Sequence, residues 1–212
     1  MKLKEGGSLQ APLLLFLLNL AAIAGLTAVG PAEKSLGANV RVVYLHGAWV
    51  WTALASFLLS ALAGLAGLLT RREAVHRWSQ ALGRTGLLFW ITYLPLSMWA
   101  MQTNWNGLFL AEPRWRLGVI FALGGIILQI GLALIDEPAW ASAGNIVFIL
   151  VLGLALQRSQ QIMHPSSPVM ESGSGRIQAF FAGLVLLCLL AAWQIARAWV
   201  RMERSKVSKP AY

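Results

Sequence analysis

The chain has 212 residues, of which 58% are hydrophobic and only 12% are charged, and its formal net charge is +9. Its mean hydropathy of +0.65, with so few charges, excludes an ordinary water-soluble domain. The basic surplus does not indicate nucleic acid as a partner, because the lysines and arginines cap apolar runs instead of forming one folded basic face. We expect anionic lipid headgroups to be their counter-charge.

Six apolar runs follow one another along the chain, and a helix needs about 20 such residues to cross a hydrocarbon core of roughly 30 Å. The runs cover residues 12–29, 46–70, 86–102, 117–135, 144–156 and 177–200. The run 144–156 is short for a span, but we keep it because an even number of spans brings the main basic clusters to one side. The sequence therefore predicts an all-α fold, a bundle of about six transmembrane helices that forms a single membrane domain over residues 1–212.

Basic residues gather before the first run, between the second and third runs, and after the last. They are Lys2, Lys4, Arg71, Arg72, Arg77, Arg84, Arg201, Arg204, Lys206 and Lys209. Six spans place these clusters on one side, which the positive-inside rule makes cytoplasmic together with both termini. Four arginines on the other side weaken this bias: Arg114, Arg116, Arg158 and Arg176. Residues 30–45, 103–116 and 157–176 are then the extracytoplasmic loops.

The interiors of the runs contain small residues and few ionisable groups. Ser60 and Gly64, and likewise Ala63 and Gly67, have the four-residue spacing that lets helix backbones approach closely. The single cysteine, Cys188, is expected to be a small buried hydrophobe, so a disulfide or thiol redox pair is excluded. The shortage of ionisable groups near the bilayer midplane disfavours an ion-coupled carrier, and topology alone is the argument for a small-molecule channel.

Standard catalytic signatures are missing from the chain. It has no phosphate-binding Gly-x-x-x-x-Gly-Lys, no His-Glu-x-x-His and no serine elbow, so we expect no enzyme. The absence of Cys-x-x-Cys-His also excludes a covalently attached c-type haem.

Two of the three histidines fall on the same predicted side of the membrane. His46 lies at the outer start of the second helix, and His164 lies in the outer loop before the sixth. Imidazole is a common haem ligand, so a pair at one interface could bind an iron from opposite faces. They could equally be two unrelated interfacial histidines. His76, among the cytoplasmic arginines, is expected to be a solvated loop residue.

Tryptophans are frequent near the predicted outer boundary, and the chain contains ten in all. Those near this boundary are Trp49, Trp51, Trp99, Trp105 and Trp115. Aromatic belts form at the interface of any membrane protein, so the alternative of a ligand platform stays open beside that explanation. The aromatic loop 103–116 is expected to lie on the membrane surface as a short amphipathic element.

Three segments, taken in order, resemble the haem exporter protein C family of cytochrome c maturation, part of a group of tryptophan-rich haem-handling membrane proteins. The first is Arg41-Val-Val-Tyr-Leu-His46-Gly-Ala-Trp49. The second is Trp105-Asn-Gly-Leu-Phe-Leu-Ala-Glu112-Pro-Arg114. The third is Gln160-Gln-Ile-Met-His164-Pro-Ser-Ser. The match covers roughly residues 40–201 with the same six-helix plan.

The resemblance implies specific roles for these residues. His46 and His164 would be the axial ligands of a non-covalent haem b, and Arg114 would pair with a haem propionate. The rest of the haem site would be formed by Trp49, Trp105, Phe109 and Glu112. The chain departs from the family at Leu108, Phe109 and Ala111, where tryptophans are expected.

The implied function is that of a non-enzymatic, haem-handling subunit in the cell (inner) membrane. It would bind haem at the periplasmic face, pass it to a periplasmic haem chaperone, and work with other membrane subunits of a cytochrome maturation or electron-transfer complex. The alternative is a structural scaffold subunit of a respiratory or photosynthetic complex that no longer binds haem. The missing tryptophans favour the scaffold, and the two histidines favour haem handling.

Overall fold

The computed structural model describes residues 10–159 and 169–207, and regular structure in this part of the chain is helical. The long helices are α1 (Gln10–Ala28), α2 (Val40–Thr70), α3 (Glu73–Trp105), α4 (Pro113–Ile135), α5 (Pro138–Arg158) and α6 (Gly175–Val207), and a short 3-10 helix η1 (Met170–Ser172) precedes α6. The predicted all-α bundle is confirmed for the described residues.

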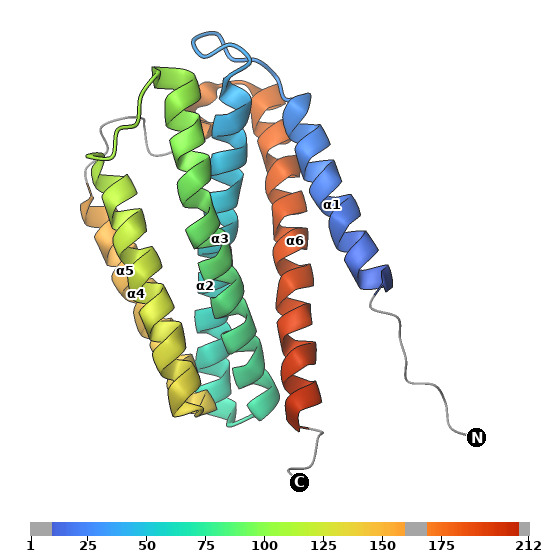
Figure 1. The fold of residues 1–212 in the computed structure, drawn as a ribbon, viewed down its shortest axis with the longest axis vertical. Coiled ribbons are helices and arrows are strands. Elements are labelled where there is room, and N and C mark those ends of the chain that lie inside the picture. Colours follow the sequence, from blue (N-terminus) through green and yellow to red (C-terminus); the bar gives the residue numbers. More distant parts are fainter. Residues whose placement is uncertain (1–9, 160–168, 208–212) are drawn as a thin grey trace.

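Successive helices run in alternating directions along the long axis of the bundle (Figure 1). The α2–α3 and α4–α5 connections lie at one end, which we call the lower end. The α1–α2 and α3–α4 connections lie at the opposite, upper end, together with the last residues of α5 and the first of α6 (Figure 1).

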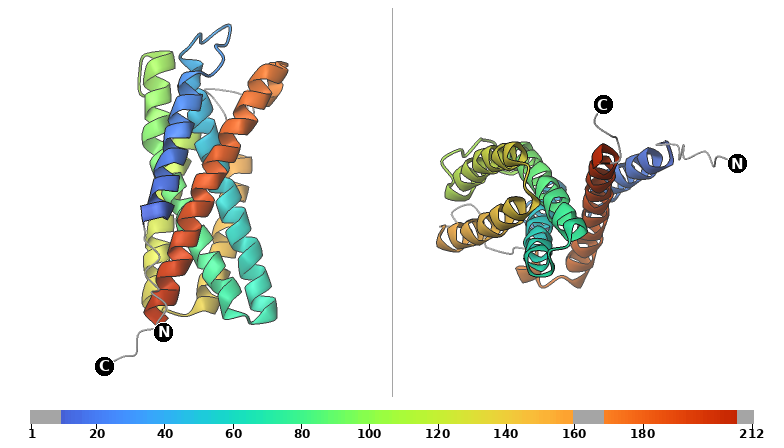
Figure 2. Two further views of the ribbon diagram at one scale, coloured as in Figure 1. Left: turned by 90° about the vertical axis from the view of Figure 1, so that its right-hand side faces the viewer. Right: turned by 90° about the horizontal axis from the view of Figure 1, so that it is seen from below.

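Helix α3 is the centre of the bundle, because it packs against α2, α4, α5 and α6. Helix α1 packs on α6 with a smaller contact to α2, and the view from below shows it on the outer side of α6 (Figure 2). Its leucines at positions 13–18 are therefore mostly exposed. The core lies where α2, α3 and α6 meet, and it contains Cys188, as expected of a small buried hydrophobe.

Five of the described helices, α1, α2, α4, α5 and α6, are long and apolar enough to cross a membrane. The predicted membrane character is thus supported by their length and composition. Helix α5 has 21 residues, because Pro138 begins it well before the short apolar run 144–156. Helix α3 has 33 residues but carries Glu73, Arg77 and Arg84 in its first half. Four neighbouring helices surround α3, so its polar side chains can find partners within the bundle.

The prediction of a basic loop over residues 71–84 is wrong. Only Arg71 and Arg72 connect α2 to α3, and Arg77 and Arg84 are helical. Arg71 adopts a left-handed conformation (φ 54°), and its N–H donates to the carbonyl of Gly67 at 2.7 Å, so the chain reverses at once. Charged residues suggested a loop, but this segment folds back as a helix along α2.

The prediction that His76 is solvated is also wrong, since its exposed fraction is only 7%. A Cβ atom at Gly67 would lie 2.8 Å from the His76 Nδ1 atom, so the absence of a side chain on α2 makes room for the imidazole ring. Gly64 likewise faces Ser79 of α3 and the backbone of Ser142 in α5. The small residues of α2 therefore allow the close helix packing that their spacing predicted.

Candidate functional site

The candidate residues that the structure describes all lie in the upper half of the bundle, and His164 lies outside the described residues. His46 is in the second turn of α2, since the helix begins at Val40 and not at position 46. Its ring is partly buried, with its centroid 5.8 Å from that of Tyr93 in α3 at an interplanar angle of 50°. Tyr93 was not among the predicted site residues, because its position opposite His46 depends on how α2 and α3 face each other.

Trp49 is partly buried and joins α2 to α3. Its indole Nε1 donates to Thr92 Oγ1 at 2.8 Å, and its ring centroid is 4.7 Å from that of Phe89. Trp51 and Trp99, in contrast, are about half exposed, at 53% and 51%. The structure thus gives Trp49 a packing role, whereas Trp51 and Trp99 have the exposure expected of an interfacial belt.

The α3–α4 connection is a tight turn that starts after Trp105, the last residue of α3. The N–H of Glu112 donates to the carbonyl of Phe109 at 3.0 Å, and Glu112 directly precedes α4. Residues 108–110 form the tip, and the side chains of Leu108, Phe109 and Leu110 are 47%, 42% and 43% exposed. This tip therefore offers an apolar surface at the upper end, although it is a turn where an amphipathic element was predicted.

Arg114 and Trp115 are in the first turn of α4 and carry unpaired donors. The Arg114 Nε and Trp115 Nε1 atoms are buried, and neither has a hydrogen-bond acceptor in the described part of the chain. An unpaired buried donor costs about 1–3 kcal/mol. The first turn of α4 is therefore a place where an acceptor from outside the described residues would stabilise the protein.

Gly118, one turn after Arg114, fixes α4 against α3. The Tyr93 hydroxyl lies against its Cα, where a Cβ atom would overlap it, and Trp90 Nε1 donates to the Gly118 carbonyl at 3.0 Å. Tyr93 thus contacts both the His46 ring and α4. Through Tyr93, the structure links the α2 segment of His46 to the α4 segment that follows Arg114.

A second polar cluster, absent from the sequence predictions, joins α2, α3 and α5 in the lower half. The His76 Nδ1 and Ser142 Oγ atoms are 2.6 Å apart. The hydroxyls of Ser60 and Ser79 each donate to the other's backbone carbonyl, at 2.6 and 2.9 Å. Asn145 Nδ2 donates to the Ser79 carbonyl at 3.1 Å. Uncharged polar residues inside apolar runs were the available signal for this cluster, because such groups need partners away from water.

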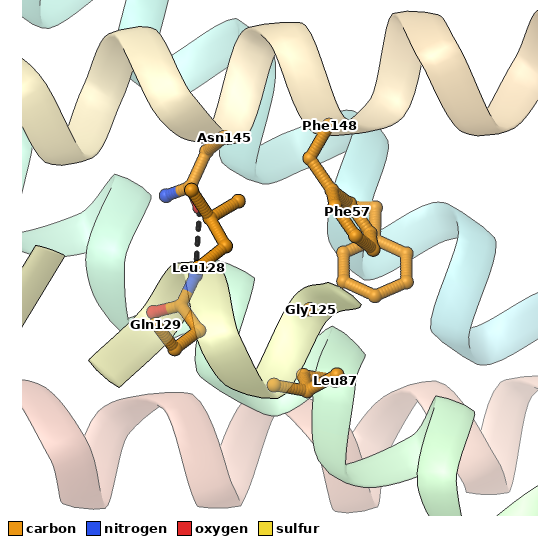
Figure 3. Close-up of a pocket in the computed structure, with 7 residues that line it drawn as sticks. All are labelled: Phe57, Leu87, Gly125, Leu128, Gln129, Asn145 and Phe148. Atoms are coloured by element: carbon orange, nitrogen blue, oxygen red, sulfur yellow. Dashed lines mark hydrogen bonds between the residues drawn. The ribbon is translucent and has the colours of Figure 1, made fainter. Parts of the chain in front are cut away.

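The same cluster borders a small pocket between α2, α3, α4 and α5 (Figure 3). Gln129 Nε2 donates to Asn145 Oδ1 at 3.0 Å at one side of this pocket, while Phe57 and Phe148 form the other (Figure 3). Its void of about 10 Å³ is roughly the room that one water molecule needs. The pocket therefore cannot hold a cofactor.

Within residues 10–159 and 169–207, no three His, Cys, Asp or Glu side chains converge as a metal site. Comparison with models of known protein families finds no match, and comparison with curated proteins finds none either.

Proposed function

We propose that this protein is a non-enzymatic, haem-handling membrane subunit of the cytochrome c maturation type, with non-covalent haem b at the upper end. The observation that carries the proposal is the pair of buried, acceptor-less donors on Arg114 and Trp115, at the same end as the His46 imidazole. Haem would supply an iron that takes imidazole ligands and propionates that accept hydrogen bonds.

The described residues provide some, but not all, of the contacts that haem would need. His46 provides the imidazole, and the Arg114 Nε provides a cationic donor for a carboxylate. Trp105 ends α3, and Phe109 and Glu112 lie in the connection that leads to Arg114. The exposed apolar side chains of this connection suit a flat, apolar ring. Trp49 does not fit, because α3 already uses its indole N–H and packs against its ring. His164 remains the second axial ligand only by resemblance.

We take all six helices as spans, with the lower end and both termini cytoplasmic in the inner membrane. Arg71, Arg72 and Arg201 at the lower end support this orientation by the positive-inside rule. The upper end would then pass haem to a periplasmic chaperone. Exposed side chains along α4, such as Ile120, Ile127 and Leu134, offer an apolar face to lipid or to other membrane subunits of the complex.

Cysteine labelling of intact cells tests this orientation. A cysteine at Leu108 should react with a membrane-impermeant maleimide from outside, and a cysteine at Arg71 should react only after the cells are opened. Labelling of the position-71 cysteine in intact cells would show that the lower end faces outward, which contradicts the proposed orientation.

The alternative function is a structural scaffold subunit that no longer binds haem. It is favoured by the packed position of Trp49 and by the aliphatic side chains of Leu108 and Ala111, where the resembled family has tryptophans.

An absorption spectrum of the full-length protein, purified in detergent from haem-replete cells, separates the two functions. Haem held by two histidines should give a Soret band and sharp α and β bands on reduction. A visible region without bands, even after hemin is added, would contradict haem handling and support the scaffold.

A further inference from the structure

The lower halves of α3 and α6 carry a group of arginines and tryptophans that the proposed function does not use. Trp78 of α3 stacks on Trp193 of α6, with ring centroids 4.9 Å apart and an interplanar angle of 8°. The guanidinium of Arg197 lies 6.0 Å from the Trp193 ring centroid. The two helices also meet at a second cation–π contact, in which the Arg84 guanidinium of α3 lies 5.8 Å from the ring centroid of Trp199 in α6.

Helix α6 presents part of this group as one stripe. Trp193, Arg197 and Arg201 are four residues apart and therefore share a face of the helix, and all three are exposed. Arg77 and Arg84 have carboxylate partners, Glu73 at 2.7 Å and Glu203 at 2.6 Å. In contrast, Arg197 and Arg201 form no ion pair with any described residue. The stripe therefore displays two guanidinium groups whose charge the described chain leaves unbalanced.

The apolar segments place this stripe at one boundary of the hydrocarbon layer. On α6, residues 177–196 contain no charged side chain, and Arg197 comes directly after them. On α3, residues 85–105 contain none either, and Arg84 comes directly before them. Arg84 and Arg197 thus mark the level where the apolar segments of two contacting helices end, and tryptophans are enriched at this level in membrane proteins.

We propose that the stripe of Trp193, Arg197 and Arg201 binds the phosphate headgroup of an anionic phospholipid. Charge complementarity selects this occupant: the phosphate level of a bilayer lies where the two unpaired guanidinium groups are displayed. A guanidinium stacked on an indole keeps its edge donors, which match phosphate oxygens in a bidentate way. The buried Trp199 Nε1, which has no acceptor in the described chain, is a further donor beside the stripe. The Trp193 indole would lie against the glycerol and upper acyl region.

This inference does not depend on haem or on which side of the membrane the lower end faces. Delipidated full-length protein in detergent is titrated with dioleoyl phosphatidylglycerol or with dioleoyl phosphatidylcholine, and bound lipid is counted by native mass spectrometry. We expect tighter binding of phosphatidylglycerol. Arg197→Gln should weaken it about fivefold, and Arg197→Gln with Arg201→Gln about 25-fold, because each arginine near a headgroup contributes about 1 kcal/mol. Binding of phosphatidylcholine should change less, because its choline cation offsets the charge of its phosphate.

The matched control is Arg71→Gln with Arg72→Gln, which removes the same charge from the exposed α2–α3 turn at the same end. This variant should keep phosphatidylglycerol binding within about twofold, because we expect binding to depend on contacts at the stripe and not on the net charge of the protein. Arg197 and Arg201 are exposed, so their replacement should leave the unfolding temperature in detergent unchanged. Equal losses in the two double variants, or no lipid preference in the original protein, would overturn the proposal.

Discussion

The polar cluster of the lower half and the first turn of α4 in the upper half differ in whether their buried polar groups have partners. In the lower half, the side chains of His76, Ser79 and Asn145 are buried, and each has a hydrogen-bond partner. In the upper half, the Arg114 and Trp115 donors are buried without an acceptor, and the neighbouring turn exposes three apolar side chains. The polar cluster of the lower half is thus paired among described residues, whereas the first turn of α4 would gain stability from an acceptor that binds there.

This difference means that an unusual residue type is a poor guide to function in this protein. The His76 ring lies against Ser142 and Gly67, and these contacts are those of helix packing. His46 lies near residues whose hydrogen-bonding capacity is unused. Substitutions at the two ends should therefore affect different measurements.

The largest expected effect is loss of stability from Gly64→Leu in the lower half. A Cβ atom at Gly64 would lie 3.0 Å from the Ser142 carbonyl oxygen and 3.3 Å from its Cα, which are backbone atoms that cannot move aside. Overpacking costs about 1–3 kcal/mol and occasionally more, and we expect a leucine against fixed backbone atoms to lie at the upper end of that range. Thermal unfolding in detergent, followed by size-exclusion chromatography, should show a clear drop in midpoint.

The control for this substitution is Gly124→Leu, because a Cβ atom at that α4 position meets nothing within 4 Å. If both leucine variants are as stable as the original protein, the close packing of α2 against α3 and α5 is not what holds the lower half together.

Alanine variants of the histidines should separate effects on protein stability from effects on the haem spectrum. His76→Ala removes the partner of the Ser142 hydroxyl and leaves a void beside Gly67, so we expect a loss of about 2–3 kcal/mol with an unchanged haem spectrum. His46→Ala should shift a low-spin spectrum towards high-spin, and we predict the same for His164→Ala. A wild-type spectrum in both of these variants would remove the two histidines from the haem site.

Arg114→Ala should weaken haem retention without changing the spin state. It removes one charge-assisted contact to a propionate, worth on the order of 1.5 to 3 kcal/mol. Hemin titration followed at the Soret band measures the change. Arg116→Ala is the matched control, because Arg116 is exposed and its Nε already donates to the Leu110 carbonyl at 3.3 Å. Equal weakening by both variants would show general charge attraction in place of a specific contact.

The smallest expected effect is a pH dependence in the α1–α2 connection. The Glu33 carboxylate accepts hydrogen bonds from the backbone N–H groups of Leu36 and Ser35, and these lower the pKa of Glu33 from its ordinary value of 4.5. A lowered pKa stabilises the turn above that ordinary value, and the contribution is lost as the pH falls through the lowered pKa. The protection of the Ser35 and Leu36 amides, measured as their hydrogen exchange relative to the intrinsic rate at each pH, should therefore fall in acid. Glu33→Gln should remove this acid dependence, and an unchanged pH profile in that variant would contradict the role of the carboxylate.

The order of the six helices could be predicted because each contains a distinct apolar run. The start of α3 could not, since Glu73, Arg77 and Arg84 look like loop residues. Only the structure shows that the glycines of α2 face His76 and Ser79 in this segment. In the candidate site, the common end of His46 and Arg114 follows from the alternation of helices. The burial of Trp49 does not, because it depends on which face of α2 meets α3, and no periodicity in α2 alone reveals that.

On the proposed topology, in which all six helices are spans, the two-residue α2–α3 connection at Arg71 and Arg72 also constrains how the chain enters the membrane. The first half of α3 contains charged residues that would be costly in lipid on their own. Because Ser60 and Ser79 exchange hydrogen bonds across this connection, α2 can shield that half of α3 as soon as both are synthesised. The two helices should therefore insert as one hairpin, before α5 arrives to supply Ser142 and Asn145, so the order of synthesis matches the order in which polar groups find their partners.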